Sequence, residues 1–267
     1  MSRAVQIALL AAAPVAAAAC ATQGLLRIAL PTGPGTPAPE YATAFATALI
    51  RCHDVRTFSA QLSLSGHAGN QKRRGSALVG LVSGALRLEA LAPGGSPAFI
   101  LVADGSRGRL LLARDRRVLE GAPPADILDA LVGIALGPDD LRALLSGCLR
   151  ASTEAAGARA YGSVWIAVDL VGGGTMYLRR GSDGVWRIAA GTYAGLTIRY
   201  GESVSPTPSQ IRLTSPASAG RPDLDVTLGV SQAEVNGDLP RDQLVALTIP
   251  PGTSPISLQE LRESYHR

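Results

Sequence analysis

Alternation of apolar and polar residues dominates the chain after residue 55. In residues 58–65 (FSAQLSLS) and 86–90 (LRLEA), every second residue is apolar. A period of two places the apolar side chains on one face of a β-strand. Residues 98–103 (AFILVA) and 109–113 (RLLLA) are apolar almost throughout. This is typical of strands that are buried on both faces. We therefore predict a series of strands joined by short turns.

Three segments have helical spacing instead. Residues 40–52 (EYATAFATALIRC) have apolar residues three and four apart, which predicts a short amphipathic helix. Residues 125–134 follow Pro123-Pro124 and carry apolar residues on one face, namely Ile127, Leu128, Leu131 and Ile134. A further helix begins at Gly137-Pro138-Asp139 and ends at Gly147, with acidic residues in its first turn. These last two helices interrupt the strands.

From residue 159 the pattern returns to strands and glycine-rich turns. We predict strands at residues 160–170, 175–179, 185–190, 196–200, 210–214 and 223–235. A last short helix is expected at 239–246, and residues after 250 are expected to form a loosely held tail.

The whole pattern predicts a mainly β (α+β) fold. We expect about 11–12 antiparallel strands in up-and-down order. Such a sheet would reduce its exposed, unpaired edges by curling toward a barrel. The central helices would cover it as a lid, and the first helix would precede it. Aromatic residues make up 4% of the chain, so the interior must be lined by aliphatic side chains. It is either a packed aliphatic core or an aliphatic cavity under the lid, and both remain open.

The N-terminus has the pattern of an export signal. A basic start and an apolar run precede small residues and Cys20, in the order Ala17-Ala18-Ala19-Cys20. This order resembles the bacterial lipobox, which implies that Cys20 is lipidated and anchors the chain to a membrane. The absence of Asp after Cys20 resembles the sorting pattern for the outer membrane. The alternative is ordinary cleavage near Ala19, which would give a soluble periplasmic protein.

Composition shifts divide the chain into four parts. We expect a signal peptide at 1–19, a lipidated cysteine with a flexible Pro/Gly tether at 20–39, a single domain at 40–250, and a C-terminal tail at 251–267.

The net charge of +4 is scattered, with no basic stripe interleaved with aromatics, which argues against nucleic-acid binding. Two cysteines remain besides Cys20. In an exported protein Cys52 and Cys148 are a candidate disulfide, the alternative being two buried thiols.

The residue patterns of common enzymes are missing from the sequence. The three histidines are scattered, and neither an HExxH nor a GxSxG motif nor a phosphate-binding glycine loop is present. His53 beside Cys52 is better explained as a surface residue than as the base of a thiol pair. We expect neither an enzyme nor a bound metal or cofactor.

The order of these features resembles the outer-membrane lipoprotein receptor LolB and its periplasmic relative LolA. The resemblance is carried by RLEALAP at 87–93, by PPADILDALVGIALGPDDLRALLSG at 123–147 and by SQIRLT at 209–214. It implies an unclosed antiparallel barrel capped by helices, with an apolar cavity for the acyl chains of lipoproteins delivered by a soluble LolA-like carrier. The chain departs from the family at Gly94, which stands where the family has a protruding leucine for membrane insertion.

Our first hypothesis is an outer-membrane-anchored lipoprotein that binds acyl chains of lipoproteins or other lipids. The candidate cavity lining is Phe58, Leu62, Leu64, Leu86, Leu88, Phe99, Leu101, Leu110 and Leu112. The candidate lid is Ile127, Leu128 and Leu131. The alternative is a non-catalytic structural or accessory lipoprotein of an envelope complex, in which the same barrel is filled.

Overall fold

The computed structural model describes residues 29–92, 95–150, 153–201, 207–218 and 223–265. The strands are β1 (Thr36–Pro37), β2 (Phe58–Ala68), β3 (Gln71–Val82), β4 (Ala85–Leu91), β5 (Pro97–Asp104), β6 (Arg107–Leu112), β7 (Arg117–Ala122), β8 (Ala155–Tyr161), β9 (Trp165–Leu170), β10 (Thr175–Arg180), β11 (Trp186–Tyr193), β12 (Leu196–Tyr200), β13 (Gln210–Ser215), β14 (Leu224–Val235) and β15 (Ser254–Pro255). The helices are α1 (Tyr41–His53), α2 (Pro124–Val132), α3 (Pro138–Leu145), α4 (Arg241–Val245) and α5 (Leu258–Tyr265).

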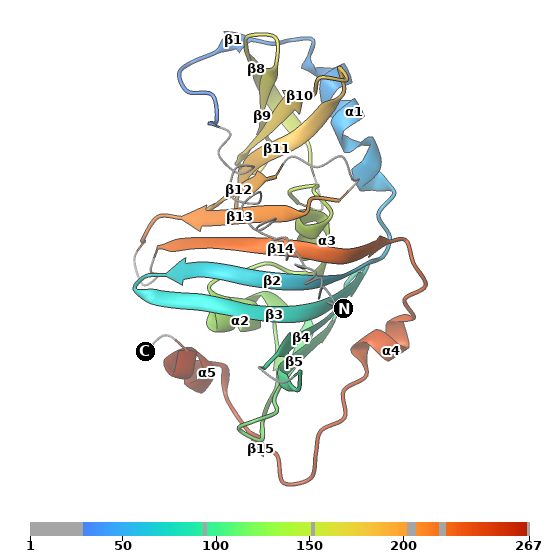
Figure 1. The fold of residues 1–267 in the computed structure, drawn as a ribbon, viewed down its shortest axis with the longest axis vertical. Helices are drawn as coiled ribbons and strands as arrows, with labels where there is room; N and C mark the ends of the chain where they lie inside the picture. The colour runs from blue at the N-terminus through green and yellow to red at the C-terminus, as the bar shows by residue number, and fades with distance from the viewer. Residues whose placement is uncertain (1–28, 93–94, 151–152, 202–206, 219–222, 266–267) are drawn as a thin grey trace, which may run out of the picture.

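The described strands form one continuous, unclosed sheet (Figure 1). Their order is β1-β8-β9-β10-β11-β12-β13-β14-β2-β3-β4-β5-β6-β7-β15, and all pairs are antiparallel except β15 with β7. The predicted fold class is therefore confirmed. The strand number exceeds the expected one partly because the two-residue strands β1 and β15 cover the sheet's two edges, which limits edge-to-edge pairing with other chains.

The predicted alternation sets which face of the sheet is buried. Leu88, Leu101 and Leu110 lie directly opposite one another on β4, β5 and β6. We call the face that carries them the inner face. Arg87 and Glu89, one residue away on β4, point to the opposite, outer face and pair with each other at 2.6 Å.

Three helices pack on the inner face. α1 covers β9–β11, α2 lies on β6, and α3 lies against β3 and β4. Their buried side chains belong to one hydrophobic cluster with the inner face of the sheet. The predicted N-terminal helix and the two central helices are thus confirmed. In the described residues no helix is long and apolar enough to cross a membrane.

The C-terminal segment crosses to the other side of the molecule. α4 packs on the outer face of β3–β5, where Leu244 forms a small separate cluster with Val82 and Ala85. The chain then pairs with the edge strand β7 through β15, and α5 packs against α2. Leu261 of α5 is fully buried, so the expectation of a loosely held tail is wrong.

Two further expectations differ from the structure. Residues 160–170 form not one strand but the hairpin β8–β9, because Gly162 turns the chain with a φ of +62°. Thr36 and Pro37, within the expected flexible tether, pair with Ala160 and Arg159 of β8. The first difference comes from a local turn at Gly162, and the second from pairing with a strand that is distant in the chain.

Candidate functional site

The nine candidate lining residues all lie in one hydrophobic cluster on the inner face. Six of them are buried to 7% exposure or less: Phe58, Leu62, Leu86, Leu101, Leu110 and Leu112. The other three, Leu64, Leu88 and Phe99, are partly buried and pack against the same cluster. The period-two register brings them together, since Phe99 faces Leu112 and Leu101 faces Leu110 across β5 and β6.

The candidate lid residues lie in the same cluster. Ile127, Leu128 and Leu131 of α2 are between 0% and 4% exposed. α2 begins with Pro124 in its first turn and ends at Gly133, whose φ of +77° suits glycine. The Cδ1 atom of Ile127 lies next to Gly108 on β6, so α2 touches the wall directly.

Wall and lid side chains therefore pack against each other in this structure. Removing aliphatic surface from water stabilises this arrangement by about 25 cal/mol per Å². An acyl chain can reach the inner wall under α2 only if α2 moves away from the sheet. The structure brings the predicted wall and lid together as one aliphatic cluster.

The other central helix, α3, is fastened by several directed contacts. Cys52 of α1 and Cys148, just beyond α3, form a disulfide with a Cα–Cα distance of 5.5 Å, which confirms the predicted pair. The Tyr193 hydroxyl on β11 donates to Asp140 Oδ2 at 2.6 Å, and the Arg150 guanidinium lies 4.7 Å from the centre of the Tyr193 ring. Burial, and then the hydrogen bond to Asp140, raises the pKa of Tyr193 to about 12.

The segment after α3 is also anchored inside the sheet. The backbone N–H of Leu149 donates to the hydroxyl of Tyr200 at 2.9 Å, and both residues are buried. Leu149 packs against Gly191 of β11, where no side chain stands in its way. Burial raises the pKa of the Tyr200 hydroxyl above its usual value. α3 and the residues that follow it are thus held to α1, β11 and β12.

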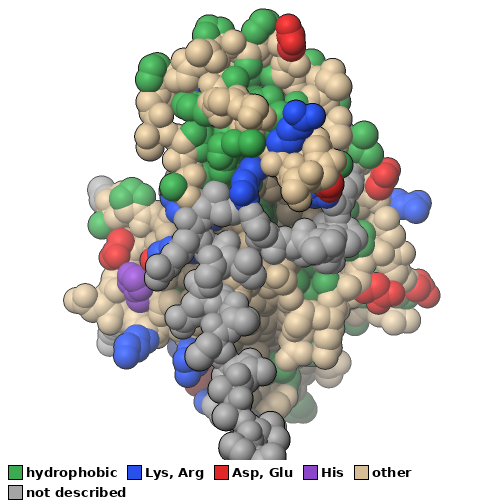
Figure 2. Space-filling model, turned by 45° about the horizontal axis from the view of Figure 1, so that its top comes forward, with side chains coloured by type: hydrophobic (Ala, Val, Ile, Leu, Met, Phe, Trp, Pro, Cys, Tyr) green, Lys and Arg blue, Asp and Glu red, His purple; other side chains and the backbone are tan. Residues whose placement is uncertain are grey.

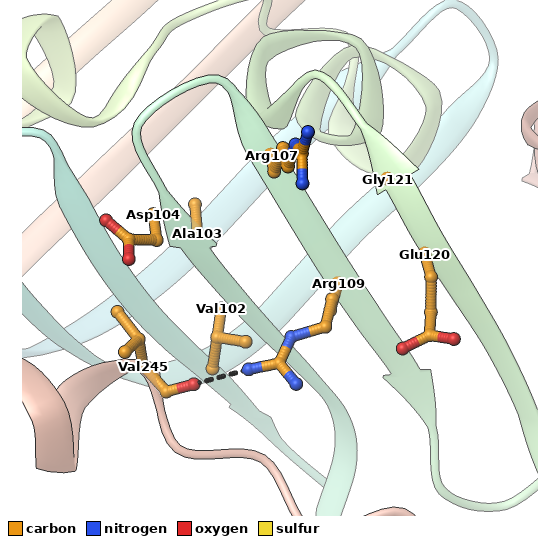
Figure 3. Close-up of a pocket in the computed structure, with 8 residues that line it drawn as sticks. All are labelled: Val102, Ala103, Asp104, Arg107, Arg109, Glu120, Gly121 and Val245. Carbon is orange, nitrogen blue, oxygen red and sulfur yellow. Dashed lines mark hydrogen bonds between the residues drawn. The ribbon is translucent and has the colours of Figure 1, made fainter.

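A pocket of about 450 Å³ lies on the outer face, away from the wall and lid (Figure 3). It is lined by Val102, Ala103, Asp104, Arg107, Arg109, Glu120, Gly121 and Val245. Arg109 donates to the carbonyl oxygen of Val245 at 2.7 Å, which ties the last residue of α4 to β6. Its four charged residues make this pocket unsuited to acyl chains. The sequence did not predict this pocket. Strand alternation places Arg107 and Arg109 on the outer face, but it does not show that Val245 of α4 packs beside them.

Two positions singled out in the sequence lie outside the described residues. One is Cys20, the candidate lipid attachment site. The other is Gly94, at the turn where the family that the sequence resembles carries a leucine for membrane insertion. Among the residues that are described, no group of three or more His, Cys, Asp or Glu side chains is arranged to hold a metal ion.

No protein-family model matches the sequence, and no curated protein matches it significantly. Solved structures do share its fold. A DUF1329 family protein from Desulfovibrio piger aligns with a TM-score of 0.51 at 9% identity, over 76% of this chain and 96% of the other. A LolA superfamily protein from Nitrosomonas europaea aligns with a TM-score of 0.50 at 10% identity, over 76% of this chain and 97% of the other. The chain therefore has a LolA-like fold.

Proposed function

We propose that this protein is a lipid-anchored envelope protein that binds acyl chains against the inner face of its sheet, with α2 as the lid. The observation that carries the proposal is the convergence of wall and lid residues on one aliphatic cluster within an unclosed sheet. The LolA-like fold supports it. By its resemblance to LolB and LolA, the protein would receive lipoproteins at the outer membrane, from a soluble LolA-like carrier.

Binding would depend on the hydrophobic effect with few directed contacts. Each methylene group moved from water onto the wall contributes about 0.8 kcal/mol. The wall residues are aliphatic apart from Phe58 and Phe99, so they select for a hydrocarbon chain and not for a particular head group. Several lipid classes would therefore bind.

The contacts of the two central helices indicate which one moves. α3 is held by the disulfide and by the Tyr193–Asp140 hydrogen bond. The buried face of α2, in contrast, makes apolar contacts through Ile127, Leu128 and Leu131. The connection between the helices runs from Gly133 to Gly137. We propose that α2, together with α5, which packs against it, swings about this connection while α3 stays in place, which would uncover β6 and its neighbours.

The experiment measures acyl-chain binding by the Cys20→Ala chain, which serves as the parent chain. Two variants of this parent are compared with it, one at a leucine of the inner face and one at a leucine of the outer face. Leu64→Asp places a charge at a partly buried position on the inner face of β2. Leu78→Asp is the matched control, because Leu78 is 44% exposed on β3 outside the wall cluster. We expect fluorescent fatty-acid uptake and co-purified acyl species, detected by mass spectrometry, in the parent chain and in Leu78→Asp. Leu64→Asp should lose both while keeping its circular dichroism spectrum.

A second function is favoured by the packed state of the interior. If wall and lid never separate, the same domain would act as a structural or accessory lipoprotein of an envelope complex. Absence of acyl species from the gently purified parent chain, together with no uptake of fatty acid, would establish this alternative.

Anchoring by Cys20 is tested separately. Metabolic labelling with a radioactive fatty acid should mark the full chain and not Cys20→Ala, and membrane fractionation should place the labelled form in the outer membrane. Release of an unlabelled chain into the periplasm would instead indicate ordinary cleavage near Ala19.

A further inference from the structure

Two hairpin turns at one end of the sheet present an apolar and aromatic surface. Val164, in the β8–β9 turn, is 46% exposed, and Val185, in the β10–β11 turn, is 41% exposed. The turns are neighbours, because the backbone N–H of Arg180 donates to Val164 O and that of Gly181 donates to Val185 O, each at 2.9 Å. We call Tyr161, Val164, Trp165, Val185 and Trp186 the tryptophan tip.

The two tryptophans of the chain both lie in this tip. Trp165 faces Arg179 across β9 and β10, and Trp186 faces Arg180 across β10 and β11. Trp165 and Trp186 are each partly exposed and lie on opposite faces of the sheet at this end. Trp165 shares the outer face with Arg179 and Arg187, whereas Trp186 packs against the margin of the inner-face cluster. Figure 2 shows hydrophobic side chains gathered on the upper lobe that these strands form in Figure 1, with cationic side chains beside them. Tryptophan and tyrosine beside arginine are characteristic of proteins that rest in the head-group region of a bilayer.

The charge around the tip is positive. Residues 159–187 contain four arginines and two aspartates, a net charge of +2. The Arg179 guanidinium lies 5.8 Å from the centre of the Trp165 ring, so that cation and aromatic ring occupy the same part of the surface. Juxtamembrane cations gain about 1 kcal/mol each near an anionic bilayer surface. The tip therefore complements anionic phospholipids.

The N-terminal segment enters the fold at this same end. Tyr161 donates its hydroxyl hydrogen to Gly33 O at 3.0 Å, and Thr36 pairs with Ala160. Gly33 is the thirteenth residue after Cys20. Thirteen residues span at most about 45 Å, so a lipid on Cys20 would keep the tip close to the bilayer.

We propose that the tryptophan tip is a membrane-docking surface that rests in the head-group region of an anionic bilayer. The inference depends on the lipid anchor of the proposed function only for orientation. The tip's own affinity for lipid is a property of the folded domain. Docking through the tip would add a second, weak attachment to the anchor and fix the orientation of the sheet above the membrane.

Intrinsic fluorescence tests this directly, since every tryptophan reports on the tip. The Cys20→Ala chain is titrated with vesicles of phosphatidylethanolamine and phosphatidylglycerol, and with vesicles of phosphatidylcholine alone. We expect a blue shift of the emission and quenching by brominated lipid with the anionic vesicles, and a much weaker response to phosphatidylcholine. The double variant Val164→Asp/Val185→Asp should bind anionic vesicles at least about tenfold more weakly, because two added anions are repelled by the surface.

The matched control is Val171→Asp. Val171 is 48% exposed and lies at the opposite end of β9, so the same exchange there should leave vesicle binding unchanged. No blue shift in the parent chain, or an equal one in the double variant, would overturn the inference. A blue shift that depends on protein concentration without vesicles would show that a second copy covers the tip, and would overturn it too.

The readout separates this inference from the proposed function. Fatty-acid uptake by the inner face should be unchanged in Val164→Asp/Val185→Asp. Vesicle binding without fatty-acid uptake would sustain the tip and refute the cavity, and the reverse result would sustain the cavity alone.

Discussion

Ile127 on α2 and Gly108 on β6 are in such close contact that a Cβ atom added to Gly108 would lie 2.7 Å from Ile127 Cδ1. The same atom would lie 3.0 Å from the carbonyl oxygen of Ala122, so it is confined from two sides. The missing side chain of Gly108 therefore allows α2 to lie directly on the wall.

Gly108→Val is expected to push α2 off the sheet. Because the added atoms must displace Ile127 or the Ala122 backbone, the free energy of unfolding should fall by about 1–3 kcal/mol, measured by urea denaturation. Gly75→Val on β3 is the control, since nothing lies within 4 Å of a Cβ there and valine favours strands. Equal stability of the two variants would contradict direct packing of lid on wall.

Removal of the Cys52–Cys148 disulfide should destabilise the domain by about 2–5 kcal/mol, because the bridge closes a loop of 96 residues. The double variant Cys52→Ser/Cys148→Ser and the parent chain are compared by urea unfolding with and without reductant. Reductant should lower the parent's midpoint to that of the variant and leave the variant unchanged. A parent chain insensitive to reductant would speak against a stabilising bridge.

The hydrogen bond from Tyr193 to Asp140 predicts a stability change at high pH. The folded-state pKa of Tyr193 is raised to about 12 from 10, so the stability linked to its protonated form is complete below pH 10. That stability is lost as the pH rises from 10 to 12. Unfolding experiments across this range should show a steeper decline in the parent chain than in Tyr193→Phe. The raised pKa of Tyr200 gives a decline of the same sign, which Tyr193→Phe retains.

α5 has its own start signal, which predicts the effect of losing it. Ser257 Oγ accepts from the Glu260 N–H at 3.2 Å, and Glu260 Oε2 accepts from the Ser257 N–H at 2.8 Å, forming a capping box. Ser257→Ala should cost about 1 kcal/mol of local stability and speed amide hydrogen exchange in α5 and in α2 beneath it. Gln259→Ala, on the exposed side of α5, should leave exchange in α2 as it is.

The sequence alone determined most of the strands, the inner face and the presence of the two central helices. Residues 58–64 and 86–88 show their buried face through alternation, because strand geometry turns successive side chains to opposite sides. Pro124 marks the start of α2 through its restricted backbone dihedral angle, which is a local property, whereas the helix ends at Val132, two residues before the expected end, because Gly133 adopts a φ of +77°. The cysteine pair followed from the export signal and the cysteine count.

Only the tertiary structure decided where separate segments meet. α5 has just Leu258, Leu261 and Tyr265 on its packed side, too few to predict burial in a charged segment, and it is held because α2 offers an apolar surface. The pairing of Thr36 with β8 joins segments that are more than 120 residues apart in the chain. The tryptophan tip likewise requires two turns to meet side by side, which is a property of sheet order and not of any local pattern.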